Sequence, residues 1–189
     1  MEQEVSRIGK TFTTKRLLFR TLQDEDLDHV HRQFSDPEMC RYFSEPPMDR
    51  RTAAETIKFF QHPEHDPYLR YAMIHRETGA FIGTCGYHHL DRDRRQVELG
   101  YDVWKEFWGQ GYATEAIEPL LALCFEELGV EQVYVLIDRQ NLGSIKTARK
   151  FGFEDSEPCR PLDDPNEVCM KLTQADRQQR LADTEFNNR

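Results

Sequence analysis

The residues with the clearest chemical potential lie between Trp108 and Ala116, in the segment WGQGYATEA. Gly109 and Gly111 follow a strand-like run, 97–103, and lead directly into a helix-like run. Because glycine has no side chain, N–H groups at the start of that helix could approach a ligand closely. A helix N-terminus attracts anions, so the segment could hold a phosphate group. An ordinary turn is the alternative, since turns also favour glycine.

Two other ligand-binding patterns are absent from the sequence. The chain contains no G-x-x-x-x-G-K-[ST] pattern, which excludes a P-loop nucleotide site as the role of the glycines. The segment His62-Pro63-Glu64-His65 lacks the i, i+4 pair of histidines that a zinc protease carries on a helix. We therefore interpret residues 62–65 as a loop and predict no metal site.

The period of the apolar residues predicts the elements before the glycine segment. The chain opens with a strand at Lys15–Arg20 and two helices, one starting at the acidic segment 23–27 and one spanning Thr52–Phe60. Thr52 is a candidate N-cap of the second helix, because Glu55 follows three residues later. Three strands with short turns come next and predict an antiparallel meander. They span residues 71–74, 81–87 and 96–103.

The chain after the glycine segment predicts a helix, a strand at 132–138, a shorter helix at 144–151 and final strands. Pro119 lies inside the first of these helices and removes one backbone hydrogen bond, so we expect a kink. Gly129 and Gly152 stand where glycine often ends a helix. Strand, helix and strand in this order form a βαβ-like unit that continues the meander.

Length and charge restrict the classes of protein that this chain can be. Its 189 residues predict a single domain, 1–189, with a polar leader at 1–13 and a polar tail at 174–189. A net charge of −9 without a Lys/Arg run argues against nucleic acid or anionic membranes as partners. It suits an amine-bearing partner, but acidity that serves solubility is the commoner explanation. The five cysteines form no C-x-x-C pair, and no stretch reaches the ~20 apolar residues of a membrane span, so we expect a cytoplasmic protein.

Four spaced blocks of the sequence resemble a known family. They are Thr14-Lys15-Arg16-Leu17 with Arg20, Glu98-Leu99-Gly100-Tyr101, the glycine segment, and Asn141-x-x-Ser144 followed by Lys150-Phe151-Gly152-Phe153. In this order and spacing the chain is similar to the GNAT superfamily of N-acetyltransferases, in its RimJ/RimL-like, ribosomal-protein-type branch. The resemblance implies an α/β (α+β) fold with a central, mixed, mostly antiparallel sheet of about six or seven strands and about four helices. It also implies that strands four and five splay apart.

The resemblance further implies acetyl-CoA as the donor, with its pyrophosphate on the glycine segment. Pantetheine would lie in the splay and pair with the backbone like an added strand, where an N–H would stabilise the oxyanion. For the Trp108 side chain we expect packing beneath the loop rather than ligand contact, and for Lys105 a solvated position. The residues implied in coenzyme A binding are Tyr101, Asp102, Val103, Trp108, Gly109, Gln110, Gly111, Tyr112, Ala113, Thr114 and Asn141.

Amine attack on a thioester needs a base for the amine proton and benefits from an acid for the departing thiolate. Glu98 is the predicted base, because Glu98, Gly100 and Asp102 share one strand face and the glycine leaves room for a substrate. A solvent-facing carboxylate is the alternative. His88 and His89 would point to opposite faces of the preceding strand, so one of them could line the same cleft.

Ser144 is the candidate acid. The tyrosine that many family members carry on this helix corresponds to Ala148 here, and Ser144 lies four residues earlier on the same side. An N-cap role for Ser144 and protonation of the thiolate by solvent are the alternatives. Asn141 would close the splay opposite Tyr101, with a turn at the strand end as its alternative.

These residues predict an N-acetyltransferase that moves acetyl from acetyl-CoA to a primary amine by direct attack in a ternary complex. The alternative is a non-catalytic acyl-CoA-binding sensor or partner module, which the missing helix tyrosine motivates. The wall of the acceptor site should come from the loops at 44–51 and 61–69 and from the final strands. Because loops vary too freely to interpret, the acceptor stays open between a protein N-terminus and a small molecule. A broad acidic groove over Glu98 would favour a peptide and a closed pocket a metabolite. A monomer and a homodimer both fit the sequence.

Overall fold

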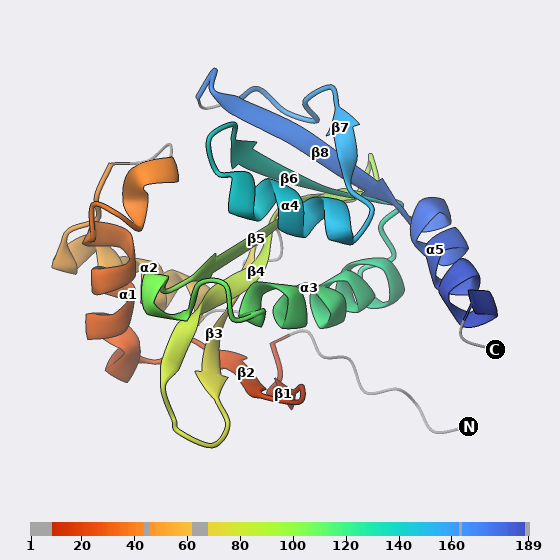
Figure 1. Ribbon diagram of the computed structural model, residues 1–189. Helices are drawn as coiled ribbons and strands as arrows, with labels where there is room; N and C mark the ends of the chain where they lie inside the picture. The colour runs from red at the N-terminus through yellow and green to blue at the C-terminus, as the bar shows by residue number, and fades with distance from the viewer. Residues whose placement is uncertain (1–8, 44–45, 62–67, 163, 188–189) are drawn as a thin grey trace.

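The computed structural model describes residues 9–43, 46–61, 68–162 and 164–187. Its centre is one sheet of eight strands in the order β1-β2-β3-β4-β5-β6-β8-β7 (Figure 1). Neighbouring strands are antiparallel except β5 and β6, which run parallel. The strands are β1 Phe12–Thr13, β2 Leu17–Thr21, β3 Leu69–His75, β4 Phe81–Asp91, β5 Gln96–Val103, β6 Gln132–Asp138, β7 Glu154–Ser156 and β8 Glu167–Thr173.

Helices cover both faces of the sheet and enclose two apolar cores (Figure 1). The pair α1 and α2 packs on one face, around Val30, Ile57 and Trp104. On the other face, α3 and α4 cover a larger core that includes Val97, Ile117, Leu120 and Ala148. The helices are α1 Leu27–Ser35, α2 Arg50–Phe60, α3 Tyr112–Ala122, α4 Leu142–Lys150 and α5 Gln174–Asn187, with short 3₁₀ turns at Asp24–Asp26, Cys40–Tyr42 and Lys105–Phe107.

The separation of β5 from β6 organises the molecule. These two strands pair only at Gln96–Gln132, Val97–Val133 and Glu98–Tyr134. Beyond Glu98, β5 continues beside β4 as far as Val103, while β6 continues beside β8. The splay predicted between strands four and five is therefore confirmed; it falls between β5 and β6 because the two-residue β1 adds a strand before the first predicted one.

Two helices, α2 and α4, begin earlier than the period of their apolar residues predicts. Asp49, not Thr52, is the N-cap of α2, since its Oδ1 accepts from the Thr52 N–H at 2.7 Å. A carboxylate outside the apolar stripe leaves no periodic signal, but it satisfies an N–H that the helix itself cannot. The second helix, α4, starts at Leu142 and ends as predicted before Gly152, whose φ is +90°.

The helix after the glycine segment is α3, and it contains Pro119 as predicted. A π-helical segment, Leu123–Glu127, follows it, and Gly129 at φ +68° ends the whole stretch. The polar tail forms α5, which is docked and not frayed. Arg177 of α5 pairs with Glu118 at 3.3 Å and Glu126 at 3.0 Å, so ion pairs connect this helix to the α3 region.

All five cysteines are free thiols, and Cys85, Cys124 and Cys169 are buried. Burial raises the pKa of the Cys85 and Cys124 thiols to about 12, which leaves them protonated and unreactive. Among the described helices, none has the length and apolarity needed to cross a bilayer.

Candidate active site

The start of α3 takes its shape from two glycines. Gly109 and Gly111 have φ values of +73° and +81°, a region that a Cβ makes unfavourable. Gly111 is the N-cap of α3, and the first N–H groups of a helix have no partners within it. Arg16 lies beside them: its guanidinium donates to the Gln110 carbonyl at 3.0 Å and stacks 4.2 Å from the centre of the Tyr112 ring. Oriented N–H groups and a cation together form an anion site.

Glu115 holds Arg16 in this position. Its Oε2 accepts from Arg16 Nε at 2.6 Å, and its Oε1 accepts from the Arg16 N–H and the Thr14 hydroxyl, each at 2.6 Å. Although burial opposes the effect, these hydrogen bonds keep the pKa of Glu115 below its usual value. Sequence reasoning gave Arg16 no role of its own; the signal was its opposite charge to Glu115 in another of the family blocks.

A cavity of about 670 Å³, here named the α3 cavity, extends from the start of α3 to the start of α4. Gln110 is the one predicted coenzyme A residue outside its lining, because Gln110 Nε2 turns back to the Glu106 carbonyl at 2.9 Å. The predicted residues that the cavity brings together are Tyr101, Asp102, Val103, Trp108, Gly109, Gly111, Tyr112, Ala113, Thr114 and Asn141.

The backbone of β5 presents alternate residues to the splay. Trp104 N–H donates to the Ile82 carbonyl of the β4 edge at 2.8 Å. Hydrogen bonding alternates along an antiparallel ladder, so the backbone groups of Tyr101 and Val103 point away from β4 and into the splay. Those of Asp102 point towards β4 instead. Asp102 therefore contributes its side chain to the cavity and not the backbone contact that we expected.

Two side chains beside the α3 cavity differ from expectation. Trp108 is 47% exposed and is not packed beneath the loop. Its indole N–H donates to the Val103 carbonyl at 2.6 Å, which occupies one acceptor of the splayed edge. Lys105 is not a free, solvated lysine, because its Nζ pairs with Asp36 at 3.0 Å and with Glu38 at 3.1 Å.

A second cavity, of about 790 Å³ and here named the Glu98 cavity, lies between the sheet and the α1–α2 pair and reaches across the splay. Most of its aromatic side chains come from α1, α2 and the segments next to them, with Tyr101 from β5. Most of its charged side chains come from the strands and the β7–β8 connection, with Glu55 from α2. The two cavities meet, because six residues line both of them. These residues are Tyr42, Phe43, Tyr101, Asp102, Asn141 and Ser144.

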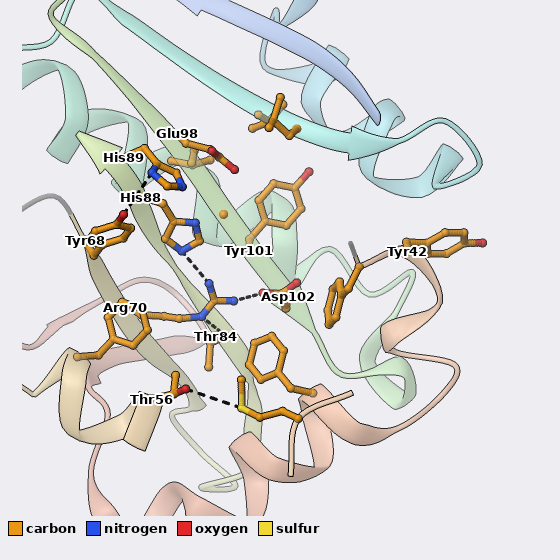
Figure 2. A pocket seen from close by; sticks show the side chains of 18 of the residues that line it. Tyr42, Thr56, Tyr68, Arg70, Thr84, His88, His89, Glu98, Tyr101 and Asp102 are labelled. Atoms are coloured by element: carbon orange, nitrogen blue, oxygen red, sulfur yellow. Dashed lines mark hydrogen bonds and ion pairs between the residues drawn. The ribbon is translucent and has the colours of Figure 1, made fainter. Parts of the chain in front are cut away.

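Glu98 projects into the Glu98 cavity (Figure 2). It is 8% exposed, so the solvent-facing alternative is wrong. Glu98, Gly100 and Asp102 share one face of β5, opposite His88, Gly86 and Thr84 of β4. Arg160, from the β7–β8 connection, donates from Nε to Glu98 Oε2 at 2.9 Å. This contact engages one carboxylate oxygen and leaves Oε1 as the second acceptor.

Both histidines of β4 line the Glu98 cavity, contrary to the prediction that they point to opposite faces (Figure 2). The reason is a bulge: pairing with β5 is irregular between His88 and Asp91, and His89 has a φ of +49°. Such strain in a residue other than glycine is typical of functional sites. Burial, together with the nearby charges of Arg70, His89 and Arg160, lowers the pKa of His88 to about 3, so its imidazole is neutral.

Arg70 is a buried charge that sequence reasoning missed. The residue is 6% exposed. Its guanidinium forms an ion pair with Asp102 and donates to Thr84 Oγ1 at 2.8 Å. Its Nη1 also lies 3.0 Å from His88 Nε2 (Figure 2). A single arginine inside an otherwise apolar central strand was the available signal, since arginine is seldom buried without partners. Arg160, in a polar loop, left no such signal.

The first turn of α4 places the two remaining candidates at the meeting point of the cavities. Asn141 is the N-cap of α4, and its Oδ1 accepts from the Ser144 N–H at 3.1 Å. The N-cap alternative for Ser144 is therefore wrong, and its side chain is available to line both cavities. Ala148 is buried at 1% exposure and carries no polar group towards them.

We searched the described residues for a group that could bind a metal ion. Within 9–43, 46–61, 68–162 and 164–187, no group of three or more His, Cys, Asp or Glu residues could hold an ion. The predicted loop at residues 62–65 lies outside these ranges, as do parts of the two loops predicted to form the acceptor wall.

Comparison with known proteins agrees with this architecture. Residues 16–154 match the family model described as the acetyltransferase (GNAT) domain. The chain belongs to this family. An uncharacterized N-acetyltransferase, p20, of Bacillus licheniformis is 31% identical over 147 residues, 77% of this chain and 83% of that protein. The spermidine N(1)-acetyltransferase of Escherichia coli K12 is 26% identical over 134 residues, 71% of this chain and 70% of that protein.

A solved structure shares the fold of this GNAT chain. The spermidine N-acetyltransferase of Vibrio cholerae, in complex with CoA and spermine, superposes with a TM-score of 0.75 at 18% identity. The match covers 87% of this chain and 99% of that one. The protein is thus an acetyl-CoA-dependent N-acetyltransferase, and its donor supplies an activated thioester carbonyl. The positive-φ glycines, the open α3 start and Arg16 fit the anionic part of this donor.

Proposed function

We propose that this GNAT enzyme acetylates the primary amine of a small cationic molecule by direct transfer, with Glu98 as the base. The observation that carries the proposal is that the α3 cavity and the Glu98 cavity share six lining residues. A donor held at α3 and an amine held near Glu98 would meet there. Direct attack needs such a meeting point, because the two reacting atoms must lie about 3–3.5 Å apart.

Glu98 has the position that a base needs. An amine arrives protonated at neutral pH and must lose a proton before its nitrogen can attack. Glu98 Oε1 can accept that proton, directly or through a water molecule, while Arg160 holds Oε2. Gly100 adds no side chain to the strand face beside Glu98. The His88 ring lies over it, and a Cβ at Gly100 would come within 2.9 Å of that ring.

The charges and aromatic rings of the Glu98 cavity support a cationic acceptor. Among the described residues, five carboxylates line it against two guanidiniums; they are Glu55, Glu98, Asp102, Asp138 and Glu167, against Arg70 and Arg160. Aromatic faces attract cations, and Tyr42, Phe43, Phe59 and Tyr68 supply them here. A volume of about 790 Å³ lies within the range of small-molecule sites, ~300–1,000 Å³. The polyamine substrates in the names of two relatives point in the same direction.

A panel of amines tests the proposal. Purified protein is incubated with acetyl-CoA and, separately, with spermidine, spermine, a monoamine of similar length, an aminoglycoside and peptides with free N-termini. Thiol release measures the rate. We expect turnover with a multiply charged amine, a weaker rate with the monoamine because it lacks the second charge, and loss of turnover in Glu98→Gln.

Two results would contradict the proposal in different ways. Turnover with peptides alone would identify a protein N-terminus as the acceptor. Stabilisation by coenzyme A against thermal unfolding, without turnover of any amine, would favour the non-catalytic sensor.

A further inference from the structure

We propose that Tyr101 of β5 donates the proton that the departing coenzyme A thiolate takes up. The inference rests on the proposed function, because it assigns the acid of the same direct transfer. Tyr101 would take the acid role that many family members give to a tyrosine at the position of Ala148, but from a different element of the fold. The tyrosine comes from a strand on one side of the splay, whereas Ala148 lies on the helix opposite.

The location of the phenol carries the inference. Tyr101 is one of the six residues that line both cavities, so its side chain lies where donor and acceptor would meet. Its ring leaves β5 and points towards the β6–α4 side of the splay (Figure 2). The hydroxyl donates to the Ser144 carbonyl at 3.3 Å, in the first turn of α4. The phenol therefore crosses the gap in which the family places pantetheine.

The other junction residues are weaker candidates. Asp102 is the ion-pair partner of Arg70, and an ionised carboxylate has no proton to give. Asn141 uses its side-chain oxygen to cap α4. The Ser144 hydroxyl is an alcohol, a much weaker acid than a phenol, whose ordinary pKa is about 10. Tyr42 lies on the 3₁₀ turn after α1, and the Arg41 guanidinium is 5.4 Å from its ring centre.

The phenol is in the state that an acid requires. Burial raises the pKa of Tyr101, although the Ser144 side chain lowers it, so the hydroxyl is protonated at neutral pH. The hydroxyl donates this proton in a hydrogen bond to the Ser144 backbone carbonyl. That hydrogen bond is long at 3.3 Å, and long hydrogen bonds are weak. The hydroxyl can exchange the carbonyl for a sulfur acceptor that carries a full negative charge, which gives the stronger interaction.

The proton transfers of the reaction balance with Glu98, Tyr101 and solvent. The ammonium first loses one proton to Glu98, which passes it to solvent. The neutral nitrogen then forms its bond to the carbonyl carbon and gives a second proton to Glu98. As the carbon–sulfur bond breaks, sulfur keeps the electron pair and takes the proton of Tyr101 Oη. Glu98 then releases its proton to solvent, and the Tyr101 phenolate takes one from solvent. The net products are the acetylated amine, the free thiol and one proton released to solvent, with both side chains restored.

The test compares two Tyr→Phe variants. We measure kcat, KM for acetyl-CoA and coenzyme A stabilisation for wild type and Tyr101→Phe. The acceptor is spermidine, or the most active amine of the panel if spermidine is not turned over. We expect kcat to fall about 100-fold, the range of a general acid, while KM and stabilisation stay within about twofold. Tyr87→Phe is the control. Tyr87 is buried at 2% exposure in β4 and lines neither cavity, so kcat should be unchanged.

A second variant separates proton donation from a structural role. Replacing Tyr101 with 3,5-difluorotyrosine keeps the ring and the hydroxyl but makes the phenol more acidic. We expect the alkaline fall of kcat to move to lower pH, since an ionised phenol cannot donate.

Three outcomes decide against the inference. Tyr101→Phe with kcat within twofold of wild type would overturn it alone and leave the proposed function standing. An alkaline limb that does not move with difluorotyrosine would assign Tyr101 a positioning role. Absence of turnover by the wild-type enzyme with every amine would overturn the proposed function, and this inference with it.

Discussion

The two cavities of this protein are built in opposite ways. The α3 cavity uses backbone conformation: two positive-φ glycines, a helix start and the splayed edge of β5. The Glu98 cavity uses buried side-chain charge, with Arg70 from β3, Glu98 and Asp102 from β5, and Arg160 from a distant connection. A backbone site needs a contiguous segment and tolerates few substitutions, whereas a side-chain site can be assembled from any strands that lie together. The fold can therefore keep one donor and accept many amines.

The largest expected effect comes from removing the base of the Glu98 cavity. In Glu98→Gln we expect kcat/KM for the amine to fall about 10²–10⁴-fold, because an amide cannot take the amine proton. Stabilisation by coenzyme A should be unchanged, since the proposed donor site is the α3 cavity. Glu131→Gln, which alters an exposed ion pair with Arg95, is the matched control. An equal loss of coenzyme A binding in Glu98→Gln would mean that the two cavities are not independent.

Breaking the buried ion pair of Arg70 tests how far the Glu98 cavity depends on charge. Arg70→Met leaves the Asp102 carboxylate without its arginine, and we expect a free energy of unfolding lower by about 3–5 kcal/mol. Chemical denaturation measures it. Arg51→Met removes an exposed ion pair with Glu55 and should change stability by less than about 1 kcal/mol. Similar losses in the two variants would show that the Arg70 pair gains nothing from burial.

The lowered pKa of His88 predicts an acid sensitivity of the same cavity. The unfolded chain binds this proton at its ordinary pKa near 6.5, whereas the folded protein binds it only near pH 3. The contribution to stability is thus complete above about pH 6.5 and decreases as pH falls towards 3. At pH 5 it should have dropped by about 1–2 kcal/mol. His88→Gln keeps an acceptor for Arg70 but cannot titrate, so its stability should depend less on pH over this window. Parallel curves for both proteins would contradict the assignment.

The smallest effect on folding, but a specific one on binding, is expected at the α3 cavity. Gly109→Ala places a Cβ at φ +73° with no protein atom within 4 Å, and the backbone strain costs about 1–2 kcal/mol. Gly129→Ala is the matched control, with φ +68° and equally open surroundings. Both should unfold at similar denaturant concentrations. Only Gly109→Ala should weaken coenzyme A binding in calorimetry, because its methyl group would enter the cavity. Equal affinities would remove Gly109 from the donor site.

The two cavities also differ in how far the sequence predicted them. The glycine segment and the meander followed from local pattern, since each depends on residues close together in the chain, whereas the splay followed only from the family resemblance. The same locality explains why almost every residue predicted beside the donor lines the α3 cavity. Asp102 also lines the cavity, but with its side chain instead of its backbone, because the alternating hydrogen bonds of the β4–β5 ladder turn its backbone groups towards β4.

The sequence by itself determined the family and the position of Glu98 on its strand face, and it predicted the donor site. Tertiary structure alone decided what surrounds Glu98: the Arg160 contact, the Arg70 network and the phenol of Tyr101 at the junction. The bulge at His89 illustrates the physical reason. A strand's alternation is local, but a single left-handed residue, His89, lies where the pairing with β5 is interrupted, and both histidines then line one cavity. Contacts between segments far apart in sequence produce no periodic pattern of apolar residues. They are therefore visible only in the structure, where the sheet brings the segments together.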